Sequence, residues 1–394
     1  MYKIQTLNAI SPIGLNHFPQ DSYEIGASIE HPDVILVRSF NLQNTVIPDS
    51  IKAIGRAGAG LNNVPVEALT KRGIPVFNTP GANANAVREL VIAGMLLASR
   101  NICKAWNYVH QLQHTSADMH RDIEENKKQF VGFELMGKTL GIIGLGSIGV
   151  KVANAAISLG MRVVGYDPTI TINRAWELSS QVKQMHSVEE LLKEADFVSF
   201  HIPLTDATKG MINAARFQVM KKNVTLLNFA RDGIIDNQAL LAALTENKIH
   251  AYVTDFPCAE LKHHPSVISL PHLGASTREA EENCAVMIAQ QIRSFLEDGS
   301  ITNAVNFPMI QAQPIQSGVR LAIVNENIPN MVAQISSKLA DAGLNITSLL
   351  NQSLHNIAYT LIDVNSYVED KVLQHITGIE GVKQLRQLTA QENK

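Results

Sequence analysis

Three glycines at a fixed spacing place the strongest constraint on how this chain can fold. They stand in GLGSIG, residues 144–149, directly after the apolar run TLGII and directly before the helix-like stretch VKVANAAISLG. Glycines in this pattern permit a tight turn, close approach of a ligand to the backbone, and close packing of the helix on the strand. The start of such a helix also attracts negative charge. The pattern therefore predicts a strand, turn and helix that bind a phosphate group, with a turn that binds nothing as the alternative.

A second strand-like run, MRVVGY, follows this helix and leads into Asp167. In dinucleotide-binding folds an acid at about this distance accepts hydrogen bonds from the ribose hydroxyls, and it repels the 2′-phosphate of NADP. We therefore expect a dinucleotide site that takes NAD. The residues expected to form it are Gly144, Gly146, Ser147, Ile148, Gly149 and Asp167.

Other apolar runs along the chain alternate with helix-length segments and end in Gly, Pro or Asp. They are DVILVRSF, IPVFNTPG, ADFVSFHIP, TLLNFARDG, IHAYVTDF and SVISLPHLG. This alternation predicts an α/β fold with parallel sheets. The apolar stretch 84–112 is expected to form one long helix, followed by an exposed polar segment at 114–129. Ser187 with Glu190, and Ser276 with Glu279, have the spacing of capping boxes at two helix starts, and Gly299 is expected to end the second helix.

The last part of the chain has a different pattern. FPMIQAQPIQSG is rich in helix-disfavouring residues and is expected to be a linker. After it, strand and helix patterns follow in the order β-α-β-β-α-β, which is typical of a ferredoxin-like domain. A chain ending near Phe307 would keep the preceding α/β units, so we expect them to stay functional without this tail, provided that the long helix beginning at Ser276 still docks on the first of them.

Composition excludes several classes of protein. A length of 394 residues fits two or three domains, and no apolar run is long enough for a membrane helix. The start lacks the features of a secretory signal, so a cytoplasmic location is expected. The formal charge of −3 gives no general attraction for nucleic acid. Cys103, Cys258 and Cys284 are isolated, so neither a disulfide nor a metal site is expected, and the expected partner is a small molecule.

Three polar side chains follow strand-like runs, where ligands bind in open α/β sheets. Arg231 follows TLLNFA, Glu260 follows VTDFPCA, and His272 follows VISLP. An acid beside an imidazole orients it and raises its pKa, and an arginine can hold a carboxylate with two parallel hydrogen bonds. Next to a hydride carrier, these three residues form a plausible catalytic set that can hold a carboxylate and move a proton. Taken singly, each residue could equally be an ordinary solvated side chain.

At these residues the chain resembles a known family. GKTLGIIGLGSIG, NFARDGIID, DFPCAE and PHLGAS, in this order, resemble the D-2-hydroxyacid dehydrogenases. GRAGAGLNNV and KRGIPVFNTPGAN resemble the phosphoglycerate dehydrogenase branch, and the tail resembles an ACT regulatory domain. The resemblance implies two Rossmann-like lobes with the cofactor lobe inserted into the substrate lobe. The implied limits are 1–88 with 282–308 for the substrate lobe, 89–281 for the NAD lobe, 309–317 for a linker, and 318–394 for the ACT domain.

The resemblance also implies roles for individual residues. Arg231 would hold the substrate carboxylate, and His272, oriented by Glu260, would take the hydroxyl proton. Further cofactor contacts would come from His201, Pro203, Ala230, Asp255, His272 and Gly274. Substrate contacts would come from Arg38, Arg56, Gly58, Ala59, Gly60, Asn83 and Arg231. Lys127 or Lys128 could reach a substrate phosphate, although a solvated charge run is the alternative.

In the tail, NENIPN resembles the ligand loop of ACT domains. The implied effector contacts are Asn325 and Asn327 of one subunit and Asn345 of another, with L-serine as the possible effector and a homodimer or homotetramer as the assembly. The function implied is NAD-dependent oxidation of 3-phosphoglycerate to 3-phosphohydroxypyruvate, the first step of serine biosynthesis. A glyoxylate or hydroxypyruvate reductase, and a nicotinamide-sensing corepressor on the same fold, remain alternatives.

Overall fold

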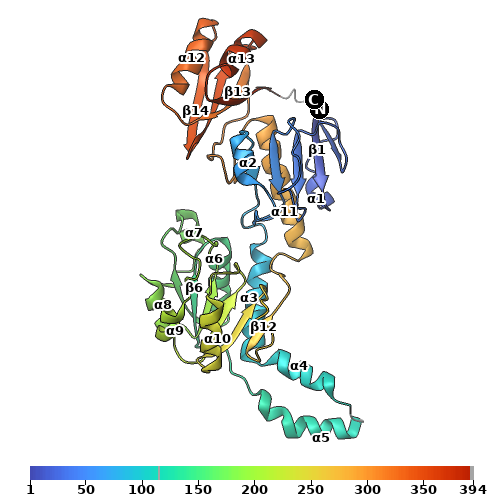
Figure 1. Ribbon diagram of the computed structural model, residues 1–394, viewed down its shortest axis with the longest axis vertical. Coiled ribbons are helices and arrows are strands. Elements are labelled where there is room, and N and C mark those ends of the chain that lie inside the picture. The colour runs from blue at the N-terminus through green and yellow to red at the C-terminus, as the bar shows by residue number, and fades with distance from the viewer. Residues whose placement is uncertain (114–115, 391–394) are drawn as a thin grey trace. The chain divides into compact units, whose positions relative to one another are not determined.

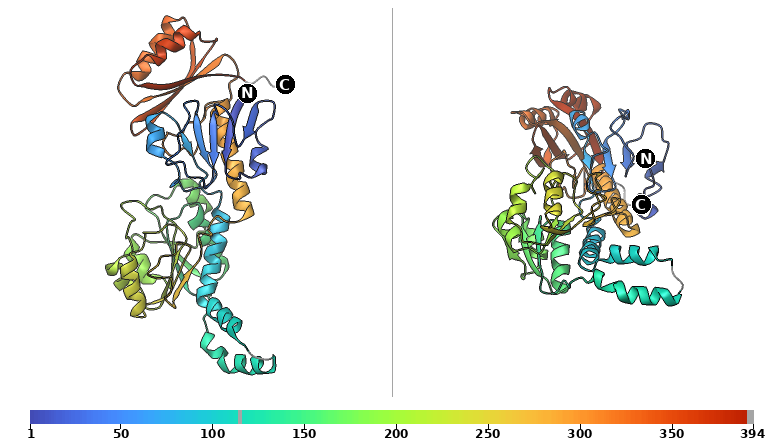
Figure 2. Two further views of the ribbon diagram at one scale, coloured as in Figure 1. Left: turned by 45° about the vertical axis from the view of Figure 1, so that its right-hand side comes forward. Right: turned by 60° about the horizontal axis from the view of Figure 1, so that its bottom comes forward.

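The computed structural model describes residues 1–113 and 116–390 and divides into two compact units (Figures 1 and 2). Unit 1 comprises Met1–Ala82 and Glu281–Lys394, and unit 2 comprises Asn83–Ala280. The chain thus changes unit after residues 82 and 280, where we expected changes after 88 and 281, and the tail belongs to unit 1. In the described ranges, no helix is long and apolar enough to span a membrane.

Unit 1 begins with a five-stranded sheet whose order is β2-β1-β3-β4-β5, and every neighbouring pair is parallel. Both faces of this sheet are apolar because helices cover both of them. One face packs against α11 around Ile288 and Ile292, and the other packs against α2 around Leu69. The strands are β1 (Tyr2–Leu7), β2 (Tyr23–Gly26), β3 (Val34–Val37), β4 (Ala53–Arg56) and β5 (Val76–Phe77). The helices are α1 (Pro12–Leu15), α2 (Val66–Lys71) and α11 (Arg278–Glu297).

The tail forms an antiparallel sheet of order β14-β15-β13-β16, with two helices on one face (Figure 1). This confirms the expected β-α-β-β-α-β order. Leu321 and Ile323 pack against the helices, whereas Ala322 and Val324 point to the opposite face and join the core around Phe295. The elements are β13 (Val319–Glu326), α12 (Met331–Asp341), β14 (Ile346–Leu354), β15 (Ile357–Val364), α13 (Asp370–Thr377) and β16 (Val382–Thr389).

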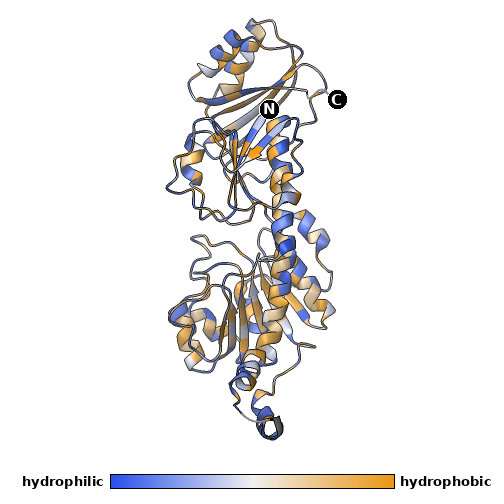
Figure 3. Cartoon of the chain, turned by 90° about the vertical axis from the view of Figure 1, so that its right-hand side faces the viewer, coloured by the Kyte–Doolittle hydropathy of each residue, from blue (hydrophilic) through white to orange (hydrophobic). Residues whose placement is uncertain are grey.

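Unit 2 is a seven-stranded parallel sheet of order β12-β11-β10-β9-β6-β7-β8. Its strands are largely apolar (Figure 3), because helices cover both faces: α3 and α6 on one, and α8, α9 and α10 on the other. The strands are β6 (Thr139–Ile143), β7 (Arg162–Tyr166), β8 (Lys183–Gln184), β9 (Phe197–Phe200), β10 (Val224–Asn228), β11 (Ile249–Thr254) and β12 (Val267–Ser269). The helices are α3 (Ala84–Ser99), α6 (Ser147–Ser158), α7 (Ile172–Glu177), α8 (Val188–Glu194), α9 (Ala214–Val219) and α10 (Asn237–Thr245). The predicted doubly wound α/β fold is confirmed.

The single long helix expected over residues 84–112 is wrong. The chain breaks after α3, because Asn101 has a left-handed conformation with φ +52°, and a separate helix α4 (Ile102–Gln111) follows. Helix α5 (Ser116–Asn126) and a 3₁₀ turn, η1 (Lys127–Phe130), complete the segment. Figures 1 and 2 show α4 and α5 extending away from the sheet of unit 2 as a hairpin. Residues 114 and 115 of the expected polar segment lie outside the described residues.

One of the two predicted capping boxes is correct. The Ser187 hydroxyl accepts a hydrogen bond from the Glu190 N–H, and the Glu190 carboxylate accepts one from the backbone before it. At α11 the prediction of Ser276 is wrong by one residue, because Thr277 accepts from the Ala280 N–H instead. Helix α11 ends just before Gly299, which has φ +78°, as expected of a C-terminal glycine.

Candidate active site

The glycine pattern forms the turn from β6 into α6. Gly144 has φ +94°, and a Cβ there would lie 2.6 Å from the carbonyl oxygen of His201. A Cβ on Gly149 would lie 2.0 Å from the carbonyl oxygen of Gly144, so only glycine lets the helix pack this closely on the turn. At Gly146, at the N-terminus of α6, no described residue other than its immediate neighbours in the chain and helix comes within 4 Å of the place of the missing Cβ. The first and third glycines thus serve the fold, and the second leaves open space above a helix N-terminus.

Asp167 follows β7 and lies against this turn. One carboxylate oxygen accepts a hydrogen bond of 2.7 Å from the Leu145 N–H, and the other accepts from the Thr169 N–H at 2.8 Å. The carboxylate is therefore fixed beside the glycine turn at the end of the next strand, the position expected of a ribose-binding acid.

His201 follows β9 and carries one ring nitrogen without a partner. Its Nε2 lies 2.9 Å from the Ser199 hydroxyl, whereas Nδ1 is buried and has no hydrogen-bond partner among the described residues. Burial lowers the pKa of His201 to about 3, so the ring is neutral at physiological pH. Pro203, two residues on, is exposed and accepts a hydrogen bond from Thr208 through its carbonyl oxygen.

Asp255 organises the segment that carries His272. Its carboxylate accepts a hydrogen bond of 2.9 Å from the Gly274 N–H, and its backbone carbonyl accepts one from the His272 N–H. The second carboxylate oxygen, Oδ1, is buried, and no residue that the structure describes donates a hydrogen bond to it. Burial raises the pKa of Asp255, while the Gly274 N–H and the His272 ring act in the opposite direction. Such a buried acceptor suits a ligand that brings a donor of its own.

His272 is exposed, and its backbone has φ +28°, a rare conformation for a residue other than glycine. Its ring lies 4.9 Å from the ring of Phe256. The hydrogen bonds of His272 and Gly274 to Asp255 hold this unusual turn in place, and the imidazole remains open to a ligand.

Arg231 follows β10, and its guanidinium donates a hydrogen bond of 2.6 Å to the Ala230 carbonyl oxygen. The buried Asn228 side chain donates to the Arg231 carbonyl oxygen at 2.9 Å, which fixes the backbone under the arginine. Arg231 is only half-buried. No carboxylate of the described ranges lies within ion-pair distance of Arg231, so its guanidinium group can bind an anionic ligand.

Glu260 is exposed in the turn after β11. Its carboxylate adjoins the thiol of Cys258, whose pKa is raised first by burial and then by this acid. In the described part of the chain, no hydrogen bond or ion pair joins Glu260 to His272. The expected orienting role of Glu260 therefore stays a prediction, and Asp255 is the acid that this structure places beside His272.

In unit 1 the two expected anion-binding arginines follow neighbouring strands. Arg38 comes directly after β3, and Arg56 is the last residue of β4. Asn63 links them, because its side chain accepts from Arg56 Nε at 3.1 Å and donates to the Arg38 carbonyl oxygen at 3.2 Å. Sequence reasoning missed Asn63, although its place just after the glycine-rich loop was a usable signal.

The loop Gly58–Gly60 is attached to the end of β5. Asn78 donates to the Ala59 carbonyl oxygen at 2.8 Å, and the Thr79 N–H donates to the Gly58 carbonyl oxygen. A Cβ on Gly58 would lie 2.2 Å from Arg56 Nη1, so glycine is needed for the arginine to lie over this loop. Asn83, also expected to bind substrate, is instead the residue before α3 in unit 2.

The expected effector residues lie in two places of the tail. Asn325 is buried on β13 and Asn327 is exposed after it, bonded to the His355 carbonyl oxygen. Asn345 precedes β14, and the strand register puts it at the opposite end of the sheet from Asn325. Within one chain these residues do not form a single site.

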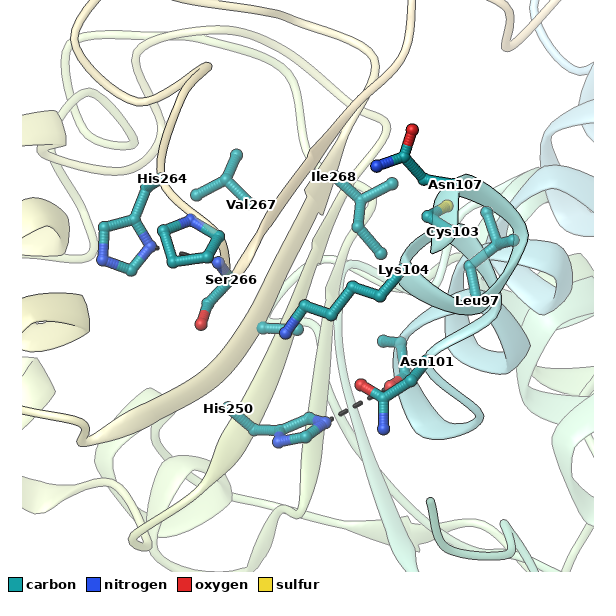
Figure 4. Close-up of a pocket in the computed structure, with 13 residues that line it drawn as sticks. Leu97, Asn101, Cys103, Lys104, Asn107, His250, His264, Ser266, Val267 and Ile268 are labelled. Atoms are coloured by element: carbon teal, nitrogen blue, oxygen red, sulfur yellow. Dashed lines mark hydrogen bonds between the residues drawn. The ribbon is translucent and has the colours of Figure 1, made fainter. Parts of the chain in front are cut away.

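Two cavities of unit 2 lie apart from the glycine turn. Lys127, Lys128 and Arg100 line one of about 500 Å³, and Lys127 forms an ion pair with Glu124. The other, of about 210 Å³, lies between α4 and the starts of β11 and β12, with Lys104 and His250 among its lining side chains (Figure 4). Because Asp255 and the His272 segment follow the opposite ends of these strands, this cavity does not belong to the candidate active site.

Comparisons with known proteins agree with this geometry. Residues 92–274 match the family described as D-isomer specific 2-hydroxyacid dehydrogenase, NAD binding domain. A D-3-phosphoglycerate dehydrogenase of Haemophilus influenzae is 33% identical over 401 residues, covering 98% of this chain and 94% of that protein. One of Methanocaldococcus jannaschii is 39% identical over 321 residues, covering 79% of this chain but only 59% of that protein, so the chain spans less than two thirds of it.

A solved structure gives the same result for the fold. The NAD⁺-bound 3-phosphoglycerate dehydrogenase of Entamoeba histolytica matches with a TM-score of 0.60 and 26% identity, over 78% of this chain and 99% of that one. Sequence identity over nearly the full length, the matching domain and the glycine turn all support one assignment. The chain belongs to the D-isomer specific 2-hydroxyacid dehydrogenase family.

Proposed function

We propose that the protein is an NAD-dependent D-3-phosphoglycerate dehydrogenase, which oxidises 3-phosphoglycerate to 3-phosphohydroxypyruvate. This reaction opens the phosphorylated route to L-serine. The proposal rests on relatives of that name that align with 93% or more of this chain. The observation that carries it is the pair Arg38 and Arg56, joined by Asn63, because two neighbouring arginines suit a substrate with a phosphate as well as a carboxylate.

The residues present fit a dinucleotide cofactor. The open space at Gly146 suits a pyrophosphate at the start of α6, and Asp167 suits the ribose hydroxyls of NAD. The partnerless Oδ1 of Asp255 can accept from an amide such as the nicotinamide carboxamide. Ala230, His201 and Pro203 follow neighbouring strands of the same sheet and would add backbone and shape contacts.

The chemistry of unit 2 would divide between two side chains. The cofactor, when bound, supplies the acceptor for the hydride that leaves C2 of the substrate. Arg231 would hold the substrate carboxylate and polarise the C2 oxygen, and His272 would take the C2 hydroxyl proton on its exposed ring. In the reverse direction the protonated His272 returns that proton. Glu260 would stabilise the protonated imidazole of His272 only if the turn that carries Glu260 moved its carboxylate toward that ring.

The anionic groups of the substrate would be bound by side chains and backbone of unit 1. Arg38 and Arg56 supply planar guanidinium groups, and the loop Gly58–Gly60 supplies backbone N–H groups that no Cβ shields. Two alternatives from the sequence remain, a glyoxylate or hydroxypyruvate reductase and a nicotinamide-sensing corepressor. The two linked arginines argue against the reductase, and the ACT-like tail argues against the corepressor.

The test is NADH formation followed at 340 nm, with 3-phosphoglycerate, glycerate and lactate as substrates and NAD or NADP as cofactor. Turnover with NAD and 3-phosphoglycerate, and a KM far lower than for glycerate, is the expected result. A preference for reducing glyoxylate would support the reductase, and the absence of any turnover would support the corepressor.

We further propose that the protein works as a homo-oligomer with L-serine as a possible effector. The apolar side chains Ile102, Trp106 and Val109 are exposed on α4, and Trp106 is 65% exposed, which is unfavourable for an isolated helix hairpin. A second copy would cover them. Light scattering, with and without serine, measures the subunit number; a cytoplasmic location stays a prediction.

A further inference from the structure

One side chain next to the two arginines has no role in the proposed reaction. Glu281 Oε1 lies 2.7 Å from Arg38 Nη1, and the two side chains are 44% and 31% exposed. Ion pairs this open to water stabilise a fold very little, because solvent screens them and both side chains lose freedom. Stability therefore does not explain why the pair is there.

The position of Glu281 gives it access to an anion site. It lies on the first turn of α11, where the chain enters unit 1, and Arg38 reaches it from the end of β3. Cys284 lies one turn further along α11. Burial raises the pKa of its thiol, whereas the charges of Arg38 and Arg56 act to lower it. The start of α11 therefore faces the same pair of arginines that would bind the substrate.

We propose that Glu281 competes with the substrate phosphate for Arg38 and so lowers the preference of the site for a phosphorylated over an unphosphorylated substrate. This inference rests on the proposed function, since it names a further residue of the same site. In the absence of substrate, the carboxylate holds Arg38 in an ion pair. A phosphate dianion carries more charge and more acceptor oxygens than a carboxylate, so it displaces Glu281, whereas a neutral hydroxyl at the same place cannot.

The competition has a simple quantitative form. Any ligand that needs Arg38 is weakened by the same factor, which is one plus the equilibrium constant of the Arg38–Glu281 pair. A ligand that makes no use of Arg38 is not weakened by pairing. Because an exposed pair is worth little, removing the carboxylate should tighten phosphate binding by only about two- to fivefold.

The experiment compares Glu281→Gln with Glu279→Gln, which removes an equal charge from an exposed site on the same turn. In Glu281→Gln, the KM for 3-phosphoglycerate should fall about two- to fivefold at low salt, with kcat and the KM for glycerate unchanged. In Glu279→Gln all three should stay as in the wild type. The effect should shrink as salt is added, because salt screens exposed charges.

A second arm measures binding without turnover. Inorganic phosphate, titrated calorimetrically into the wild type and the Glu281→Gln variant, should bind the variant more tightly. In an Arg38→Met background, Glu281→Gln should change neither KM nor phosphate affinity. That non-additivity would tie the effect to the pair.

Four outcomes would overturn the inference: an unchanged KM and phosphate affinity in Glu281→Gln, an equal fall in KM for glycerate, the same effect from Glu279→Gln, or a rise in KM. A rise would make Glu281 a residue that positions Arg38. If the wild type does not oxidise 3-phosphoglycerate, the proposed function fails, and calorimetry with phosphate still decides whether Glu281 competes for Arg38.

Discussion

Gly146 and Gly149 lie in the same turn, yet substituting them should separate effects on the fold from effects on cofactor binding. Gly149→Ala adds a Cβ 2.0 Å from the Gly144 carbonyl oxygen, whereas Gly146→Ala adds one with no atom within 4 Å. The first methyl meets the backbone of the turn. The second occupies only the space in which we place the cofactor pyrophosphate. We therefore expect Gly149→Ala to lower stability and Gly146→Ala to leave it nearly unchanged, while both variants weaken cofactor binding.

The magnitudes follow from these distances. A carbon–oxygen contact needs about 3.3 Å, so Gly149→Ala must move helix and turn apart by roughly 1.3 Å, since 3.3 minus the observed 2.0 Å leaves that gap. Overpacking of this kind costs about 1–3 kcal/mol. At Gly146, φ is −73° and alanine fits. Alanine is a weaker N-cap than glycine, which lowers the free energy of unfolding by about 0.5–1 kcal/mol. Alanine also restricts the unfolded chain, which raises the free energy of unfolding by about 0.4–1 kcal/mol. The two effects nearly cancel, so the net change should be less than about 0.5 kcal/mol.

The assays are urea unfolding without cofactor and calorimetric titration with NADH. Gly149→Ala should lose about 1–3 kcal/mol of unfolding free energy and bind NADH weakly, because its turn is displaced. Gly146→Ala should unfold like the wild type yet bind NADH about 5- to 150-fold more weakly, the same energy range expressed as affinity.

Two results would refute this reasoning. Wild-type NADH affinity in Gly146→Ala would show that the cofactor does not approach the start of α6. Equal destabilisation by the two variants would show that the open space at Gly146 and the close packing at Gly149 do not govern their tolerance of a methyl group.

Three further predictions concern residues that follow strands of the unit 2 sheet. His272→Ala should lower kcat by about 10² to 10⁴ with NADH affinity unchanged, because a positioned proton carrier contributes about that much; full turnover in the variant would remove His272 from the reaction. Asp167→Ala should raise the ratio of NADP to NAD activity, measured as kcat/KM, and a wild type that already prefers NADP would contradict the role of Asp167. His201 has a pKa lowered to about 3, below its unfolded value, so its contribution to stability is present above about pH 6.5 and lost as the pH falls toward 3. In urea unfolding between pH 7 and 5, the wild type should therefore lose up to about 1.4 kcal/mol per pH unit more than His201→Gln, and parallel slopes would contradict a buried neutral ring.

Much of the fold could be predicted from the sequence, because its signals are local. Strand runs end where Gly, Pro or Asp appear, and the doubly wound sheet of unit 2 follows from their alternation. The close packing of Gly149 on Gly144 is also local, since it lies within one strand–turn–helix segment. Ser187 at the start of α8 and Gly299 after α11 are local signals as well, because each acts on the helix next to it.

The failures have a different physical origin. Asn101 breaks the expected helix through a left-handed conformation that apolar periodicity does not reveal. Asn63 and Glu281 escaped notice because their importance comes from Arg38, which is distant in sequence and meets them only in the folded sheet. Sequence motifs identify residues that act on a ligand. They do not identify the neighbours that hold or compete for those residues.

The tail shows a long-range effect that the sequence does not reveal. Survival of the preceding units after its removal, provided that the helix beginning at Ser276 still docks, stays a prediction, and one face of the tail sheet is part of the core of unit 1. Tyr359 is buried and donates to the Gly299 carbonyl oxygen at 2.8 Å, and the Arg386 guanidinium lies 3.9 Å from the centre of the Phe295 ring. Removing the tail would expose that apolar core, at a cost in stability of about 25 cal/mol for each Å² uncovered. The tail therefore stabilises the sheet that carries Arg38 and Arg56.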